Sequence, residues 1–307
     1  MDKNILIENW DRMVDGLSQM TNFMQSQKIY DQERLPTNAV LAVISALYTN
    51  FPPSGDQAGH INILLKRYLW SSFFTDRYEN SAASRAYADF ISILSFLEER
   101  TKPNSETKYT EKDIPIFDQL KFPICTEEEL LSVSWPKRAS IRGRGILAVA
   151  NYFKAYDFAD GKEITPANIS GREYHHIFPD ALIKEANNFL DEDLESYIAL
   201  NCALITDTTN RVIGRKDPYN YLKERNKWVD EEIVRNRLAS HLIPFNELKE
   251  GMYENYDSHQ KAEKVKKDYI NFIRKRASLI YKAMQGLVKG KDINIKEIIE
   301  KEDIRMI

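Results

Sequence analysis

The stretch Tyr174-His175-His176-Ile177-Phe178-Pro179 sets two adjacent histidines near the end of a strand-like run. The run from Arg172 to Phe178 predicts a strand, and Pro179 ends it because proline cannot donate a hydrogen bond to a β ladder. Side chains alternate along a strand, so the two imidazoles are expected to face opposite sides of the sheet. They can therefore serve two different roles in one site.

Two pieces downstream complete the pattern. A second short strand is predicted from Cys202 to Thr206, directly after Asn201. Asp207 is then predicted to cap a helical turn that carries Asn210, and Pro218 to start a further turn. The order strand, strand, helix predicts a small ββα unit with polar side chains at its junctions.

These residue types suit the hydrolysis of a phosphodiester. That reaction needs a nucleophilic water, stabilisation of charge on the phosphoryl oxygens, and stabilisation of the leaving oxygen. We assign His175 to a metal ion and His176 to the general base, although the two could exchange roles. Asn210 supplies an amide oxygen to the same metal from the helix, and Asn201 either fixes the loop or orients the base.

The expected cofactor is one divalent cation, Mg²⁺ or Mn²⁺. Two neutral protein ligands make a weak site, and an imidazole ligand also lets Zn²⁺ or Ni²⁺ compete.

The charge of the chain is unevenly placed. The net charge of -3 argues against a protein that coats nucleic acid without specificity. Basic residues nevertheless flank the histidine pair and are expected to contact phosphates with little sequence preference; they are Arg142, Arg144, Arg211, Arg215 and Lys216. The alternative is that these side chains belong to solvated helix faces.

Most of the remaining sequence has helical periodicity. We predict a mainly α fold with a small ββα-metal finger inserted, in three parts: a helical domain at 1–158, the finger at 159–228, and C-terminal helices at 229–307 that pack on it. The tail from Lys261 to Val288 is predicted to be one long amphipathic helix. The aromatic segment from Trp70 to Tyr78 could stack bases, but its helical spacing favours core packing.

Composition sets limits on the class of protein. Hydrophobic content of 43% and charged content of 29% are typical of a soluble globular chain. The chain has two cysteines, Cys125 and Cys202, too far apart in sequence to suggest a disulfide framework. No apolar run approaches the roughly 20 residues that span a bilayer, and the N-terminus lacks a signal peptide's apolar core. We therefore expect a cytoplasmic protein without a membrane partner.

The motif resembles that of a known family. Residues Arg172 to Leu222 are similar to the C-terminal HNH (His-Me finger) nuclease region of GmrSD-like, modification-dependent restriction endonucleases, which include the SspE-type effectors that sense phosphorothioated DNA. The similarity is closest in His175 to Pro179, Asn201 to Ile205 and Asn210 to Pro218, and it extends more weakly to Leu69–Tyr78 and Ser81–Asp89. Where the family has an acidic residue before the catalytic histidine, this chain has His175, which keeps a ligand but removes a charge.

The resemblance implies a metal-dependent DNA endonuclease or nickase in an anti-phage restriction system. In the family this region often follows a ParB-like NTPase domain, whose signature is absent from the sequence. The expected partners are therefore DNA and a separate ParB-like domain or subunit. Two alternatives remain: a catalytically inactive DNA-binding or regulatory module, and an RNase toxin. The intact His176 and Asn210 favour an active enzyme, and no residue pattern separates DNA from RNA.

Overall fold

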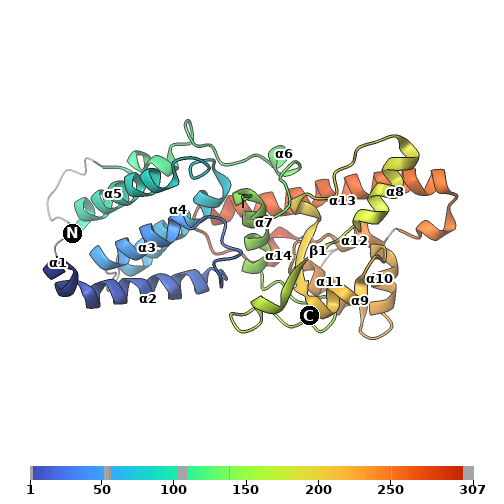
Figure 1. Ribbon diagram of the computed structural model, residues 1–307, viewed down its shortest axis with the longest axis horizontal. Helices are drawn as coiled ribbons and strands as arrows, with labels where there is room; N and C mark the ends of the chain where they lie inside the picture. Colours follow the sequence, from blue (N-terminus) through green and yellow to red (C-terminus); the bar gives the residue numbers. More distant parts are fainter. Residues whose placement is uncertain are drawn as a thin grey trace. The chain divides into compact units, whose positions relative to one another are not determined.

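The chain folds mainly into α-helices, as the sequence predicted, in the computed structural model (Figure 1). The structure describes residues 3–51, 55, 57–101, 109–137, 139–249 and 251–299. Its internal contacts form two units. The N-terminal unit is Met1–Cys125 with Gly286–Asp292, and the C-terminal unit is Thr126–Gln285 with Ile293–Ile307. This division groups residues 126–158 with the histidine motif, whereas the sequence pattern predicted that they belong to the N-terminal helical domain.

The N-terminal unit is a set of helices: α1 (Lys3–Glu8), α2 (Trp10–Ser26), α3 (Ala39–Asn50), α4 (Gln57–Phe74) and α5 (Ala82–Thr101). In Figure 1, α3 lies between α2 and α5, and the core forms where these helices meet. The apolar residues of α2 are only partly buried, because Met24 is in the core while Trp10 and Leu17 are exposed.

The aromatic segment Trp70–Tyr78 lies inside this core. Trp70 and Phe73 are fully buried, and Tyr78 donates a hydrogen bond to the buried carboxylate of Asp89. The guanidinium of Arg77 pairs with the same carboxylate at 2.8 Å. Core packing is therefore confirmed for this segment, and base stacking is not available to it.

The C-terminal unit surrounds one small sheet. Its strands are β1 (Arg172–His176) and β2 (Cys202–Thr206), and its helices are α6 (Glu127–Leu130), α7 (Ile141–Tyr152), α8 (Asp180–Leu190), α9 (Asp207–Ile213), α10 (Pro218–Arg225), α11 (Glu231–Ala239), α12 (Phe245–Lys249), α13 (Ser258–Leu287, whose last two residues belong to the N-terminal unit) and α14 (Ile295–Ile298). The long predicted tail helix is α13.

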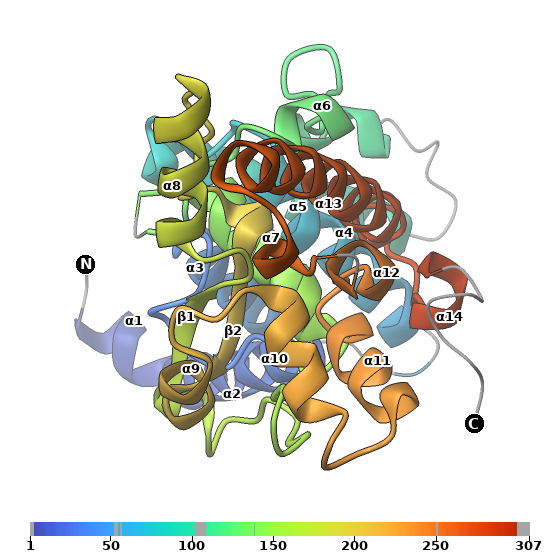
Figure 2. The same ribbon diagram turned by 90° about the vertical axis from the view of Figure 1, so that its right-hand side faces the viewer.

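β1 and β2 are antiparallel and are the only strands in the described part of the chain. His175 pairs with Ala203 and His176 with Cys202. The predicted second strand is confirmed, but β1 ends at His176, two residues before the predicted end. Figure 2 shows the two strands side by side with α9 next to them, and α9 packs on both.

The cap of α9 differs from the prediction. Thr206 occupies the N-cap position, with extended backbone angles, and its hydroxyl accepts a hydrogen bond from the Thr209 amide at 3.3 Å. Asp207 is the first helical residue and pairs with Arg211 one turn later. A threonine that ends a strand can cap the following helix without a connecting residue, so β2 leads directly into α9.

No helix among the described residues has both the length and the apolar character needed to cross a membrane.

Candidate functional site

His175 faces α9. The residue is 6% exposed, and its Nδ1 lies 2.8 Å from the amide oxygen Oδ1 of Asn210, thirty-five residues further along the chain. Phe158 contacts the ring with an edge-to-face geometry. The two residues proposed from sequence as metal ligands, one on β1 and one on α9, are thus adjacent in space.

Glu173 joins this pair and was not foreseen from the sequence. It lies two residues before His175 on β1, hence on the same face, and its Oε2 accepts a hydrogen bond from Nδ2 of Asn210 at 2.9 Å. Because the amide nitrogen is held by Glu173, the amide oxygen is directed at His175. We call Glu173, His175 and Asn210 the β1–α9 cluster; strand alternation alone could have suggested Glu173.

Burial keeps the imidazole of His175 neutral. It lowers the pKa to about 4, and the hydrogen bond to Asn210 opposes that shift only in part. A neutral imidazole is the form that binds metal ions.

The distance within the cluster also fits two ligands of one ion. Two atoms each about 2.1 Å from an octahedral cation, at right angles to one another, lie about 3 Å apart. The separation of 2.8 Å between His175 Nδ1 and Asn210 Oδ1 is close to that value. Here it is the length of a hydrogen bond in which Nδ1 donates, so an ion at this place would replace that proton. Among the described residues there is no group of three or more His, Cys, Asp or Glu side chains that could hold a metal, so an ion here would depend on the Asn210 amide.

His176 faces the other side of the sheet, as strand alternation predicted. Its ring stacks on Trp135 with centroids 4.1 Å apart, and Tyr197 contacts it edge-on at 4.6 Å. Trp135 is held there because its amide donates to the Tyr197 carbonyl at 2.8 Å. Burial lowers the pKa of His176, and nearby Asp180 opposes that effect.

The Nε2 atom of His176 is buried and has no hydrogen-bond partner within the described residues. A buried unpaired nitrogen costs about 1–3 kcal/mol. A buried polar atom without a partner is uncommon in folded proteins, and a catalytic role is one explanation for it.

Asn201 fixes the turn that follows β1. It is fully buried; its Oδ1 accepts from the Phe178 amide at 2.8 Å, and its Nδ2 donates to the carbonyls of Phe178 and Ser196, both at 3.0 Å. Of the two roles considered from sequence, this arrangement matches the fixing of the loop. Asn201 thereby holds the backbone segment that follows His176.

Asp157 anchors α9 and was also missed. Its fully buried carboxylate accepts from the amide and hydroxyl of Thr206, both at 2.8 Å, and from the hydroxyl of Thr209 at 2.6 Å. These bonds help to lower its pKa although burial acts in the opposite direction. Asp157 therefore holds the first turn of the helix that presents Asn210.

A buried arginine of α13 supports β2 from behind. The guanidinium of Arg276 donates to the carbonyls of Leu200 at 2.6 Å, Cys202 at 2.9 Å and His241 at 3.0 Å. His241 is fully buried as well, with Nε2 2.8 Å from the Tyr156 carbonyl oxygen. The bonds from Arg276 connect the start of β2 to α13.

The basic residues named from sequence fall into different environments. Arg215 is exposed, Arg211 is paired with Asp207, and Lys216 is paired with Glu224 at 2.7 Å. Arg142 is half-buried. Arg144 is only 5% exposed, and its Nε donates to the Lys137 carbonyl at 3.1 Å, so a phosphate contact does not fit its burial.

Because two histidines are buried, we predict that the protein loses stability in mild acid. Burial lowers the pKa of His241 to about 3 and that of His175 to about 4, whereas the unfolded chain binds these protons near pH 6.5. Stability is therefore full above pH 6.5 and falls as the unfolded state takes up protons that the folded state excludes. Between pH 7 and pH 5 we expect each residue to remove about 2 kcal/mol from the free energy of unfolding.

Urea unfolding at both pH values, in EDTA, measures this loss. His241→Gln keeps a donor for the Tyr156 carbonyl but does not titrate, so its loss between the two pH values should be smaller by about 2 kcal/mol. An equal loss in the wild type and in His241→Gln would contradict a neutral buried imidazole at this position.

Comparison with known proteins finds one distant relative. The chain is 25% identical over 237 residues to an uncharacterized protein of Methanocaldococcus jannaschii, in an alignment that covers 73% of this chain and 37% of the relative. The chain thus spans little more than a third of that relative's length. No family model matches the chain, and no solved structure matches it significantly.

Proposed function

We propose that this chain is a metal-dependent DNA endonuclease or nickase whose β1, β2 and α9 form a ββα-metal (HNH) core. The observation that carries the proposal is the meeting of His175 and Asn210, with Nδ1 and Oδ1 2.8 Å apart. An imidazole from a strand and an amide oxygen from the following helix are the two donors that the sequence motif assigned to one ion.

Glu173 completes the proposed metal site. Its carboxylate accepts a hydrogen bond from the Asn210 amide. It gives the cluster a negative charge, which the family's acidic residue would supply at the position of His175. Outer ligands of this kind orient the inner ones and strengthen binding. A divalent cation held there, Mg²⁺ or Mn²⁺ by preference, would supply stabilisation of the phosphoryl and leaving oxygens.

His176 is the proposed general base. An imidazole whose pKa is lowered is neutral at pH 7 and can take a proton from water. Trp135 and Tyr197 hold the ring in place, and its buried Nε2 has no partner among the described residues. The proposal therefore requires that substrate binding admits a water molecule to this nitrogen.

Phosphate contacts are proposed for Arg215 first, because it is exposed and forms no ion pair within the described residues. Arg211 and Lys216 lie near it in sequence and would have to exchange their carboxylate partners for phosphate. So few contacts imply modest, salt-sensitive affinity and little sequence preference.

The restriction role and the partner follow from the family resemblance. We propose that the nuclease acts with a ParB-like NTPase domain or subunit in defence against phage DNA. A protein that grips only phosphates needs another part to select its target.

Cleavage of supercoiled plasmid tests the activity. The protein is incubated with Mg²⁺, Mn²⁺ or EDTA, and nicked and linear forms are separated on a gel; nicking in either metal and none in EDTA is expected. The same incubation with RNA distinguishes an RNase. Binding to DNA without cleavage in any metal would identify the inactive module instead.

Metal binding provides a second prediction. We expect Glu173→Gln to weaken Mn²⁺ binding about tenfold, because it removes the charge but keeps an acceptor for the Asn210 amide. Asn210→Ala removes a direct ligand and should weaken binding further. Titration followed by Mn²⁺ electron paramagnetic resonance measures both.

Glu163→Gln is the matched control, since Glu163 is an exposed glutamate of the same unit whose ion pair among the described residues is with Lys154. Equal Mn²⁺ affinity for the wild type, Glu173→Gln and Asn210→Ala would rule out the β1–α9 cluster as the metal site.

A further inference from the structure

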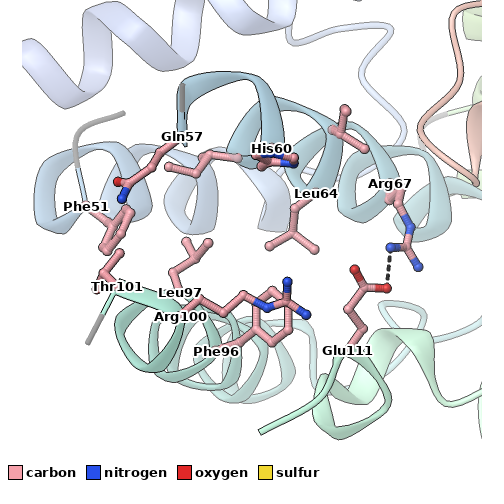
Figure 3. Close-up of a pocket in the computed structure, with 12 residues that line it drawn as sticks. Phe51, Gln57, His60, Leu64, Arg67, Phe96, Leu97, Arg100, Thr101 and Glu111 are labelled. Carbon is pink, nitrogen blue, oxygen red and sulfur yellow. Dashed lines mark hydrogen bonds and ion pairs between the residues drawn. The ribbon is translucent and has the colours of Figure 1, made fainter. Parts of the chain in front are cut away.

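The N-terminal unit contains a cavity that the nuclease proposal does not use. It has a volume of about 330 Å³ and lies between α4 and α5 (Figure 3). Cavities that hold small ligands measure roughly 300–1,000 Å³, so this one is sized for a single small molecule.

The floor of the cavity is apolar. Leu64 of α4 and Leu97 of α5 point toward one another in Figure 3, and both are buried, as is Phe96. Phe51 adds an aromatic side chain at one end. An apolar floor of this kind accommodates a flat ring.

Polar and cationic groups stand around this floor. The guanidinium of Arg100 lies over the Phe96 ring, 4.4 Å from its centroid, and Arg100 is exposed with no carboxylate partner in the described part of the chain. Arg67 is held by an ion pair to Glu111 and by the ring of Phe117. Together the two arginines and the glutamate carry a positive net formal charge, which favours the binding of an anion.

Two further groups can read the edge of a ring. Gln57, at the start of α4, carries both a donor and an acceptor, and His60 follows one turn later. Figure 3 draws the Gln57 amide beside Phe51, at the opposite end of the cavity from Arg67 and Glu111.

We propose that this cavity binds one nucleotide, with the base over Leu64 and Leu97 and the phosphate on Arg100. The guanidinium is fixed by Phe96, so its N–H edges are preorganised for two parallel bonds to phosphate oxygens. The amide of Gln57 is of the type that pairs with the edge of a base. The nucleotide is either a free mononucleotide or one unit of a strand, and the site goes beyond the nuclease activity.

Calorimetry on the whole chain in EDTA tests the site. The probes are the four 2′-deoxynucleoside 5′-monophosphates, the matching nucleosides and inorganic phosphate. We expect at least one monophosphate to bind with a dissociation constant below about 1 mM, and its nucleoside and phosphate alone to bind at least about tenfold more weakly. Failure of all four monophosphates to bind would overturn the proposal.

Arg100→Gln should weaken that binding at least about tenfold, because it removes the charge of an exposed side chain and keeps a polar group in its place. Arg12→Gln is the matched control, an exposed arginine of the same unit outside the cavity, and should bind as the wild type does. Unchanged affinity in Arg100→Gln would overturn the site.

Two further experiments distinguish a free nucleotide from a unit of a strand, and the cavity from the nuclease site. A short single-stranded oligonucleotide displaces the mononucleotide if the site takes a unit of a strand, and does not if it takes the free nucleotide. His176→Ala and Asn210→Ala should bind the mononucleotide unchanged, so the cavity and the nuclease site fail independently. Loss of binding in those two variants instead would assign the nucleotide to the β1–α9 region and overturn the cavity.

Discussion

His176→Ala is expected to lower the rate of plasmid cleavage by about a hundredfold to ten-thousandfold, the usual contribution of a general base. Its ring is held between Trp135 and Tyr197, so the imidazole is already oriented before substrate arrives. The reason for so large an effect is that no other histidine lies on this face of the described sheet to replace it.

The stability of the same variant distinguishes a reactive residue from a structural one. Removing His176 removes a buried nitrogen without a partner, which offsets part of the packing lost against Trp135. We therefore expect the free energy of unfolding to change less than the activation free energy of cleavage does. His259→Ala, on the exposed surface of α13, is the control and should alter neither.

His175→Ala must be assayed beside it, because the sequence allowed the two histidines to exchange roles. It should abolish Mn²⁺ binding, whereas His176→Ala should retain it. The opposite pattern would make His176 the metal ligand and His175 the general base. Nicking by His176→Ala at a near wild-type rate would show that His176 is not the general base.

Asp157→Ala is expected to lower the free energy of unfolding by about 3–5 kcal/mol, because it leaves several buried donors without an acceptor. Those donors are the Thr206 amide and the hydroxyls of Thr206 and Thr209. Since they fix the first turn of α9, metal affinity should fall as well, through displacement of Asn210.

Urea unfolding followed by tryptophan fluorescence measures the loss. Asp230→Ala is the matched control: Asp230 is exposed and makes no side-chain bond at the start of α11, so its loss should stay within about 0.5 kcal/mol. Equal stability of the two variants would show that Asp157 does not anchor α9.

Local patterns were enough to predict the two strands and the opposite faces of the two histidines. The alternation of β1 placed His175 and His176 on opposite faces, and the limits of β2 were correct to the residue. A capping box also forms between Thr126 and Glu129, whose spacing of three residues is the sequence signature of that motif. Each of these features depends on residues a few positions apart in the chain, so it can be predicted from one sequence.

Features that depend on distant packing were not predictable in this way. Asp157 lies forty-nine residues from Thr206, and Trp135 comes from a segment far before β1. Arg144 looked like a surface cation because its sequence is basic, yet α7 turns it inward. Tertiary contacts decide the environment of such side chains, and no local periodicity reports them.

The most direct test of the central claim is the nicking of supercoiled plasmid by the wild type and His176→Ala, each with Mn²⁺ and with excess EDTA. The account predicts nicked plasmid only for the wild type in Mn²⁺, with His176→Ala slower by about a hundredfold or more. Undiminished nicking in EDTA, or equal rates for the two proteins, would contradict it.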